Sequence, residues 1–175
     1  DTQPEVQDTP RYGLQSISIC ELLIDAGRLE AAKDQADRML PKLDKVRQPR
    51  EIALHHLVLG KIQLRRTARA RSKNYSTAAK HLKRAVDEMW KASRQDELPL
   101  VLISRAELLF LQGDRDGART DLDEAWEIAE RGSMRLYMAD VHLQRARLFG
   151  DKGELEKARA MIERCGYGRR RGTLK

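Results

Sequence analysis

The sequence predicts an all-α protein built as a right-handed solenoid of about four helix-turn-helix repeats. Charged residues make up 35% of the chain, hydrophobic residues 41% and aromatic residues only 5%, which is typical of a mostly helical protein. From Leu14 onward the apolar residues recur with a helical period. A pattern of small residue, apolar pair, glycine and alanine also recurs along the chain. A fixed repeat of this kind indicates stacked helical hairpins.

Three segments carry the repeat and align without gaps. They are CELLIDAGRLEAAKDQADRM from Cys20, AELLFLQGDRDGARTDLDEA from Ala106 and ARLFGDKGELEKARAMIERC from Ala146. A looser copy begins at ALHHLVLGKIQL, with Gly60 in the position of the small residue, and resumes at NYSTAAKHLKRAV. Small residues allow the two helices of a hairpin to approach closely, and glycine can close the first helix in the left-handed conformation.

Two markers in these copies set the expected turns and the period. The alanines are separated by 46, 40 and 40 residues, and they are Ala32, Ala78, Ala118 and Ala158. The aligned glycines, which we expect to end the first helices, are Gly27, Gly113 and Gly153. Asp114 follows its glycine directly, so we expect it to cap the next helix.

The elements follow in order from the amino terminus. Residues 1–12, which contain Pro4 and Pro10, are predicted to form a linker or a disordered arm. The repeat domain is expected over residues 13–165, with repeats at about 13–46, 50–93, 97–131 and 134–165, and residues 166–175 form a tail. The helices are predicted at 13–26 and 29–46, 50–72 and 75–93, 97–112 and 115–131, and 134–151 and 154–165. Pro41 should kink or end the second helix because it cannot donate a backbone hydrogen bond.

Charge and cysteine content indicate the kind of partner and the redox environment of the protein. The net charge of +7 suits an acidic partner but gives no specific recognition. Cys20 and Cys165 lie in apolar helical patterns, which favours free thiols in a reducing compartment. We find no apolar run of about 18 residues and no signal-peptide pattern at the start, so a cytoplasmic location and no membrane contact are expected. The chain lacks an initiator Met and ends in RRRGTLK, so we expect a piece of a longer polypeptide.

The segments from Gln112 to Ala125 and from Gly153 to Cys165 resemble the tetratricopeptide repeat, through the pattern of small residue, apolar pair, glycine and alanine. The period of about 40 exceeds the roughly 34 residues usual for that repeat, and the terminal proline is missing after Ala125. The longer helices are similar to repeats of bacterial multidomain signalling proteins. The ending MIERCGYGRRRGTL is similar to the close of repeat arrays in bacterial signal-transduction nucleotidases. The resemblance implies a sensor or scaffold arm attached to an effector domain.

The resemblance also implies a binding surface. Tetratricopeptide arrays bind an extended or helical segment along a concave face, lined mainly by the first helix of each hairpin. We therefore expect a protein–protein interaction scaffold that binds a peptide, either of a partner or of another domain of the parent chain. Carried over by position, the groove residues are Ile17, Glu21, Ile24, Leu57, Lys61, Arg65, Ile103, Glu107, Phe110, Leu143 and Arg147. The alternative is that the charged members only pair between neighbouring repeats. The family's clamp for a terminal carboxylate needs Lys and Asn, and only Lys61 matches, so we reject that ligand.

The densest basic run offers a second hypothesis, non-specific nucleic-acid binding. In KIQLRRTARARSK, residues Lys61, Arg65 and Arg69 share one helix face. The remaining basic residues of this surface are Arg66, Arg71, Lys73, Lys80, Lys83 and Arg84. No aromatic residues are interleaved with them, so a solvated basic face is favoured over nucleic-acid binding. Pairing with Asp87, Glu88 or Glu107 would count against a phosphate-binding role.

Catalysis, metal ions and cofactors are not expected. His55 and His56 are adjacent and point about 100° apart on a helix, so they cannot chelate one metal from the same turn. The segment GYGRRRG follows a helix rather than a strand and does not match a nucleotide-binding motif. Trp90 and Trp126 are expected to pack inside or between repeats. Exposed end helices are expected to allow association of copies of the chain.

Overall fold

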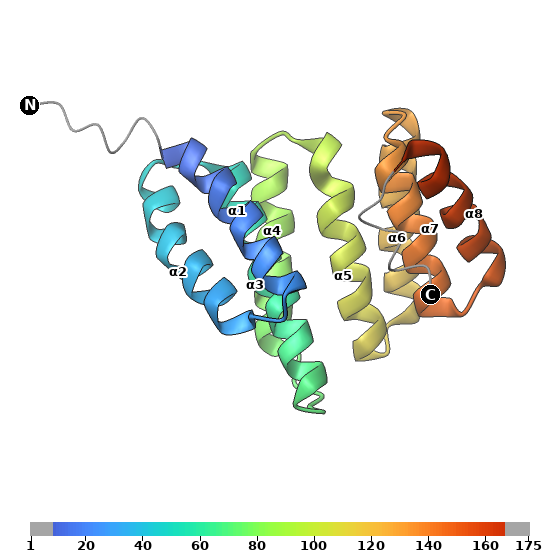
Figure 1. The fold of residues 1–175 in the computed structure, drawn as a ribbon, viewed down its shortest axis with the longest axis horizontal. Helices are drawn as coiled ribbons and strands as arrows, with labels where there is room; N and C mark the ends of the chain where they lie inside the picture. The colour runs from blue at the N-terminus through green and yellow to red at the C-terminus, as the bar shows by residue number, and fades with distance from the viewer. Residues whose placement is uncertain (1–8, 167–175) are drawn as a thin grey trace, which may run out of the picture. The chain divides into compact units, whose positions relative to one another are not determined.

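The structure is a computed structural model that describes residues 9–166, and the side chains within it from Gly13 onward. Over this range it contains eight α-helices and one short 3₁₀ helix, and no strand (Figure 1). The prediction of an all-α protein made of paired helices is therefore confirmed for the described part of the chain. The chain divides into two compact units, which adjoin in sequence between Arg94 and Gln95.

The first unit contains two helical hairpins. They are formed by α1 (Thr9–Asp25) with α2 (Leu29–Lys45) and by α3 (Pro49–Arg69) with α4 (Ser76–Lys91). Helix α3 packs against both α1 and α2. Buried side chains of these three helices form a continuous apolar cluster, whose members are Cys20, Ile24, Leu29, Ala32, Ala36, Val58, Leu59 and Ile62. The cluster joins the first hairpin to the second.

Helices α1 and α3 run in the same direction, side by side. Near their first halves, Ser16 Oγ donates to His55 Nε2 at 3.1 Å. Near their ends, Arg65 Nη1 donates to the Ile24 carbonyl at 2.8 Å. Since both residue numbers rise together, the two first helices are parallel neighbours.

Gly60 fills the position of the small residue in the second hairpin. A Cβ atom at Gly60 would lie 2.7 Å from Cγ and Cδ2 of Leu82 on α4. Such a distance is too short for two carbon atoms in contact. The absence of a side chain therefore permits the close approach of α3 and α4, as the repeat pattern predicts.

The second unit begins with the 3₁₀ helix η1 (Gln95–Glu97) and contains two further hairpins. They are formed by α5 (Leu98–Gln112) with α6 (Arg115–Arg131) and by α7 (Arg135–Phe149) with α8 (Lys152–Cys165). Helix α7 packs against both α5 and α6, so this unit repeats the contact scheme of the first. The marker alanines of the two units are buried as expected, and they are Ala32, Ala78, Ala118 and Ala158.

Two of the three predicted turn glycines, in the first and third hairpins, end the first helix as expected, and the third does not. Gly27 and Gly113 adopt positive φ angles of 75° and 93° at the ends of α1 and α5, where only glycine is unstrained. The Asp114 carboxylate caps α6 by accepting from the Gly117 N–H at 2.8 Å. In the last hairpin the left-handed glycine is Gly150, with φ 71°, and Gly153 lies within the first turn of α8.

Three predicted boundaries need correction. Helix α1 begins at Thr9, inside the predicted linker, whose residues 1–8 lie outside the described part, as do tail residues 167–175. Helix α3 ends at Arg69 rather than at residue 72. Of the two effects predicted for Pro41, a kink or an end of the helix, the second does not occur, because α2 continues to Lys45, and Leu43 in this last part is fully buried.

Candidate functional site

The first helices carry all of the predicted groove residues, but three of these are core residues. Ile24, Leu57 and Leu143 are only 4%, 2% and 3% exposed, so they are wrongly assigned as anchors for a ligand. Ile24 belongs to the apolar cluster of the first unit. The sequence pattern placed them on the correct helix but could not tell which apolar positions the neighbouring hairpin covers.

In the first unit, the remaining groove residues lie on the adjoining helices α1 and α3. Ile17, Glu21 and Lys61 are half-buried. The contact of Ser16 with His55 lies before these residues along the two helices, and the contact of Ile24 with Arg65 lies after them. Lys61 on α3 is therefore at about the same height as Glu21 on α1. Arg65 is exposed, but its guanidinium already donates to the Ile24 carbonyl, which also accepts from the Gly27 N–H at 3.0 Å.

In the second unit, the groove residues lie on α5 and α7. Ile103 and Phe110 are half-buried, while Glu107 and Arg147 are exposed. The Phe110 ring meets Phe149 edge to face, with 5.6 Å between ring centroids, a preferred aromatic geometry. One edge of Phe110 is therefore engaged by its own unit.

The predicted basic surface is neutralised in part by local ion pairs. Lys83 Nζ lies 2.7 Å from Asp87 Oδ2, and Arg84 Nη2 lies 2.9 Å from Glu88 Oε1. Arg66 Nε lies 3.4 Å from Glu30 Oε1. These pairings include Asp87 and Glu88, the partners that the sequence argument names as unfavourable to phosphate binding. Arg71, Lys73 and Lys80 are exposed.

A hollow of about 680 Å³ lies on the first unit, where the turn between α1 and α2 faces the end of α3. It is a shallow depression that is open to solvent. Its lining residues are Gly27, Arg28, Leu29, Glu30, Ala31, Arg66, Arg69 and Ala70. Arg66 and Arg69 belong to the basic surface predicted from the sequence. The contribution of the α1–α2 turn could not be predicted, because the two segments are about 40 residues apart.

The sequence did not predict the contacts of His55 or the pairing of His56 with His81. His55 is fully buried; its Nδ1 donates to the Glu51 carbonyl at 2.7 Å. His56 Nδ1 lies 3.0 Å from His81 Nδ1 on α4, and burial, followed by the neighbouring His81, lowers the pKa of His56 to about 4. Within residues 13–166, no group of three or more His, Cys, Asp or Glu side chains is arranged to hold a metal ion.

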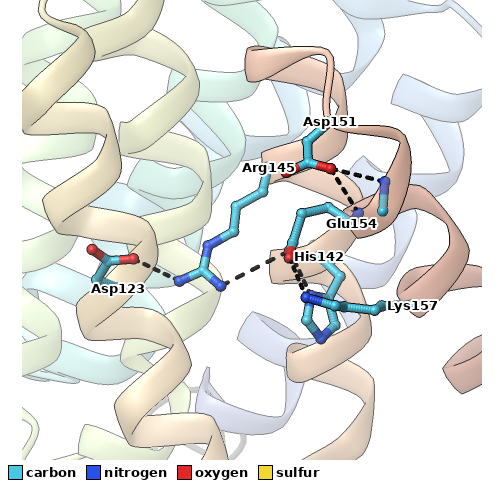
Figure 2. A network of polar contacts seen from close by, with 7 residues as sticks. Asp123, His142, Arg145, Asp151, Glu154 and Lys157 are labelled. Carbon is cyan, nitrogen blue, oxygen red and sulfur yellow. Dashed lines mark hydrogen bonds and ion pairs between the residues drawn. The ribbon is translucent and has the colours of Figure 1, made fainter.

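A polar network links three helices of the second unit (Figure 2). Glu154 at the start of α8 is its centre: Oε2 lies 2.6 Å from His142 Nδ1, and Oε1 lies 2.8 Å from Lys157 Nζ. Arg145 extends the network to α6 through Asp123, at 2.6 Å. Burial alone raises the pKa of Glu154, but the hydrogen bonds from His142 and Lys157 outweigh it and hold the pKa below its usual value. The Glu154 carboxylate thus accepts a hydrogen bond from the Nδ1–H of His142.

The two tryptophans behave differently. Trp126 is half-buried and lies against His142, with 4.6 Å between ring centroids, and beside the Arg145 guanidinium at 5.7 Å. The prediction that it packs between repeats is confirmed. Trp90 is 48% exposed, so its predicted packing role is wrong. Cys20 is buried, as expected, and its thiol lies 3.4 Å from the Ala32 carbonyl, while Cys165 is half-buried.

Comparison of the chain with models of known protein families, with curated proteins and with solved structures finds no match. Of the helices that the structure describes, none combines the length and the apolar character needed to cross a membrane. The geometry of the two units therefore provides the basis for a functional assignment.

Proposed function

We propose that this protein is a non-catalytic protein-interaction module of the tetratricopeptide type, which binds a peptide or helical segment on its first helices. The observation that carries the proposal is the packing within each unit. The first helix of one hairpin contacts the first helix of the next, α1 with α3 and α5 with α7. Adjoining first helices of this kind offer a shared surface with apolar and charged positions, which suits recognition of a helix or an extended segment.

The composition of the first helices within each unit supports a peptide ligand. Ile17, Ile103 and Phe110 are half-buried and offer partly covered apolar contacts. Glu107 and Arg147 are exposed and carry opposite charges. A solenoid formed by the whole chain, a cytoplasmic location and membership of a larger bacterial signalling protein are parts of the same proposal, which rest on the sequence pattern.

Selection from a displayed library of random peptides tests the proposal. Peptides selected on the purified protein are titrated against Glu107→Lys, on a first helix, and against Glu127→Lys, an equal charge reversal on the exposed side of α6. We expect a first-helix ligand to lose about tenfold or more in affinity for Glu107→Lys, since like charges placed at an interface are costly. Affinity for Glu127→Lys should stay within about twofold. Equal effects of both variants would refute a first-helix site.

The alternative, non-specific nucleic-acid binding around residues 61–84, has weaker support because Arg66, Lys83 and Arg84 already face carboxylates. Titration with labelled single- and double-stranded nucleic acid at several salt concentrations separates the two functions. Phosphate binding must weaken steeply as salt rises. Tight binding with that dependence would establish the alternative.

A further inference from the structure

We infer that the hollow on the first unit receives an acidic side chain, Asp or Glu, of a protein partner. The hollow lies where the α1–α2 turn faces the end of α3. None of the predicted groove residues lines it, so it is a separate site. This inference rests on the proposed function in one respect: the occupant is a protein segment.

The charges around the hollow do not balance. Arg28, Arg66 and Arg69 line it, and Glu30 is the one acidic residue of the lining. Glu30 pairs with Arg66 at 3.4 Å, and its side chain is 71% exposed, so this contact is weak and readily exchanged. Two positive charges thus remain in excess. A carboxylate that enters the hollow removes repulsion among the guanidinium groups and forms charge-assisted hydrogen bonds.

Arg69, one of the two α3 arginines in the lining, is oriented by a carbonyl of the α1–α2 turn. Arg65, on the same turn of α3, donates to the Ile24 carbonyl at 2.8 Å, and Arg69 Nη1 lies 3.4 Å from the Gly27 carbonyl. A guanidinium has five N–H donors, so one contact to a carbonyl leaves most of them for a ligand. Side chains that are already oriented lose less conformational entropy when a partner binds.

The remaining lining favours a protein carboxylate over a nucleic acid. Leu29, Ala31 and Ala70 contribute apolar surface, which suits the methylene groups of Asp or Glu. No aromatic residue is part of the lining, so bases would find no stacking platform of the kind that single-stranded nucleic acids use.

Fluorescence anisotropy with labelled hexaglutamate at low salt tests the inference, with hexaglutamine and a single-stranded oligonucleotide of equal charge as comparison probes. We expect hexaglutamate to bind, and the Arg28→Ala/Arg66→Ala variant to lose about tenfold or more in affinity. The matched control is Lys73→Ala/Lys80→Ala, which removes the same charge from exposed positions outside the hollow. No binding of hexaglutamate, equal loss in both variants, or stronger binding of the oligonucleotide that depends on the same arginines would overturn the inference.

A second variant should change the affinity in the opposite direction. Glu30→Gln removes the resident carboxylate from the hollow, so hexaglutamate should bind about threefold or more tightly. Asp34→Asn removes the same charge one turn further along α2, outside the hollow, and should change the affinity by less than about twofold. Equal gains would show a general charge effect and refute the site. The two proposals can fail separately. If hexaglutamate does not bind but selected peptides still bind the first helices and respond to Glu107→Lys, only the inference about the hollow is overturned.

Discussion

His142 Nδ1 lies 2.6 Å from Glu154 Oε2 and joins α7 to α8 within the last hairpin. Both side chains are nearly buried, at 7% and 12% exposed. The same carboxylate is bonded by Lys157, and the Asp151 side chain accepts from the backbone N–H of Glu154 at 3.2 Å. Helix capping and the interhelical contact therefore meet at one residue (Figure 2).

Glu154→Gln should destabilise the last hairpin by about 1–3 kcal/mol, because it weakens a nearly buried charged hydrogen bond that has no replacement of equal strength. Hydrogen exchange of the α7 and α8 backbone amides measures the change. Glu156→Gln is the matched control, since its 3.7 Å pair with Arg159 lies on the surface, and it should stay within about 0.5 kcal/mol. Similar exchange in the two variants would show that the Glu154 network does not hold the hairpin.

Stability of the first unit should fall between pH 7 and pH 5. Burial, and then the neighbouring His81, lowers the pKa of His56 to about 4, and burial also lowers the pKa of His81. In the unfolded chain the His56 imidazole binds a proton near pH 6.5, and in the folded chain only near pH 4. The free energy of unfolding is therefore highest above about pH 6.5 and decreases as the pH falls toward 4. The expected loss is about 1–2 kcal/mol.

Urea denaturation at pH 7 and pH 5 measures this loss. In the His56→Gln variant the dependence over that range should be smaller, since the group that takes up the proton on unfolding is absent. His142 lies in the other unit, so a His142→Gln variant serves as the control and should leave the dependence of the first unit unchanged. Equal pH dependence in wild type and His56→Gln would contradict the assignment.

Gly60→Ala should destabilise the second hairpin by about 1–3 kcal/mol, because the added methyl group would lie 2.7 Å from Leu82 and force the helices apart. Leu82→Val shortens the opposing side chain and should recover part of that loss when both changes are combined. A double-mutant cycle of unfolding free energies measures the coupling. Strict additivity of the two changes would mean that Gly60 and Leu82 do not set the spacing between the helices.

The sequence predicts hairpins well because their signals are local. Gly113 and Asp114 lie next to each other and specify one turn, and both act as predicted. Gly153 aligns with the turn glycines of the other copies, but it does not close the helix. Gly150, three residues earlier, takes the positive φ angle, and Asp151 caps the next helix. The local pattern identifies the turn but not which of two nearby glycines takes the positive φ angle.

The site is harder to predict because it depends on contacts between distant segments. Ile24 lies on the expected helix, but its burial is decided by Val58 and Ile62 on α3. His56 and His81 are 25 residues apart and meet only because α3 packs on α4. Helical periodicity shows which residues share a face; which neighbour covers that face follows from the packing.

The exposed apolar face of α1 leads to the last prediction. Leu22 is 67% exposed and Ile19 is 46% exposed, and their spacing of three places them on one side of the helix. Adjacent exposed apolar side chains favour association, so we expect the protein to self-associate with rising concentration in sedimentation experiments. Leu22→Lys should shift the equilibrium toward monomer. Leu136→Lys, at a 44% exposed position on α7, is the control and should leave association unchanged; a monomer at every concentration would refute a role for the α1 face.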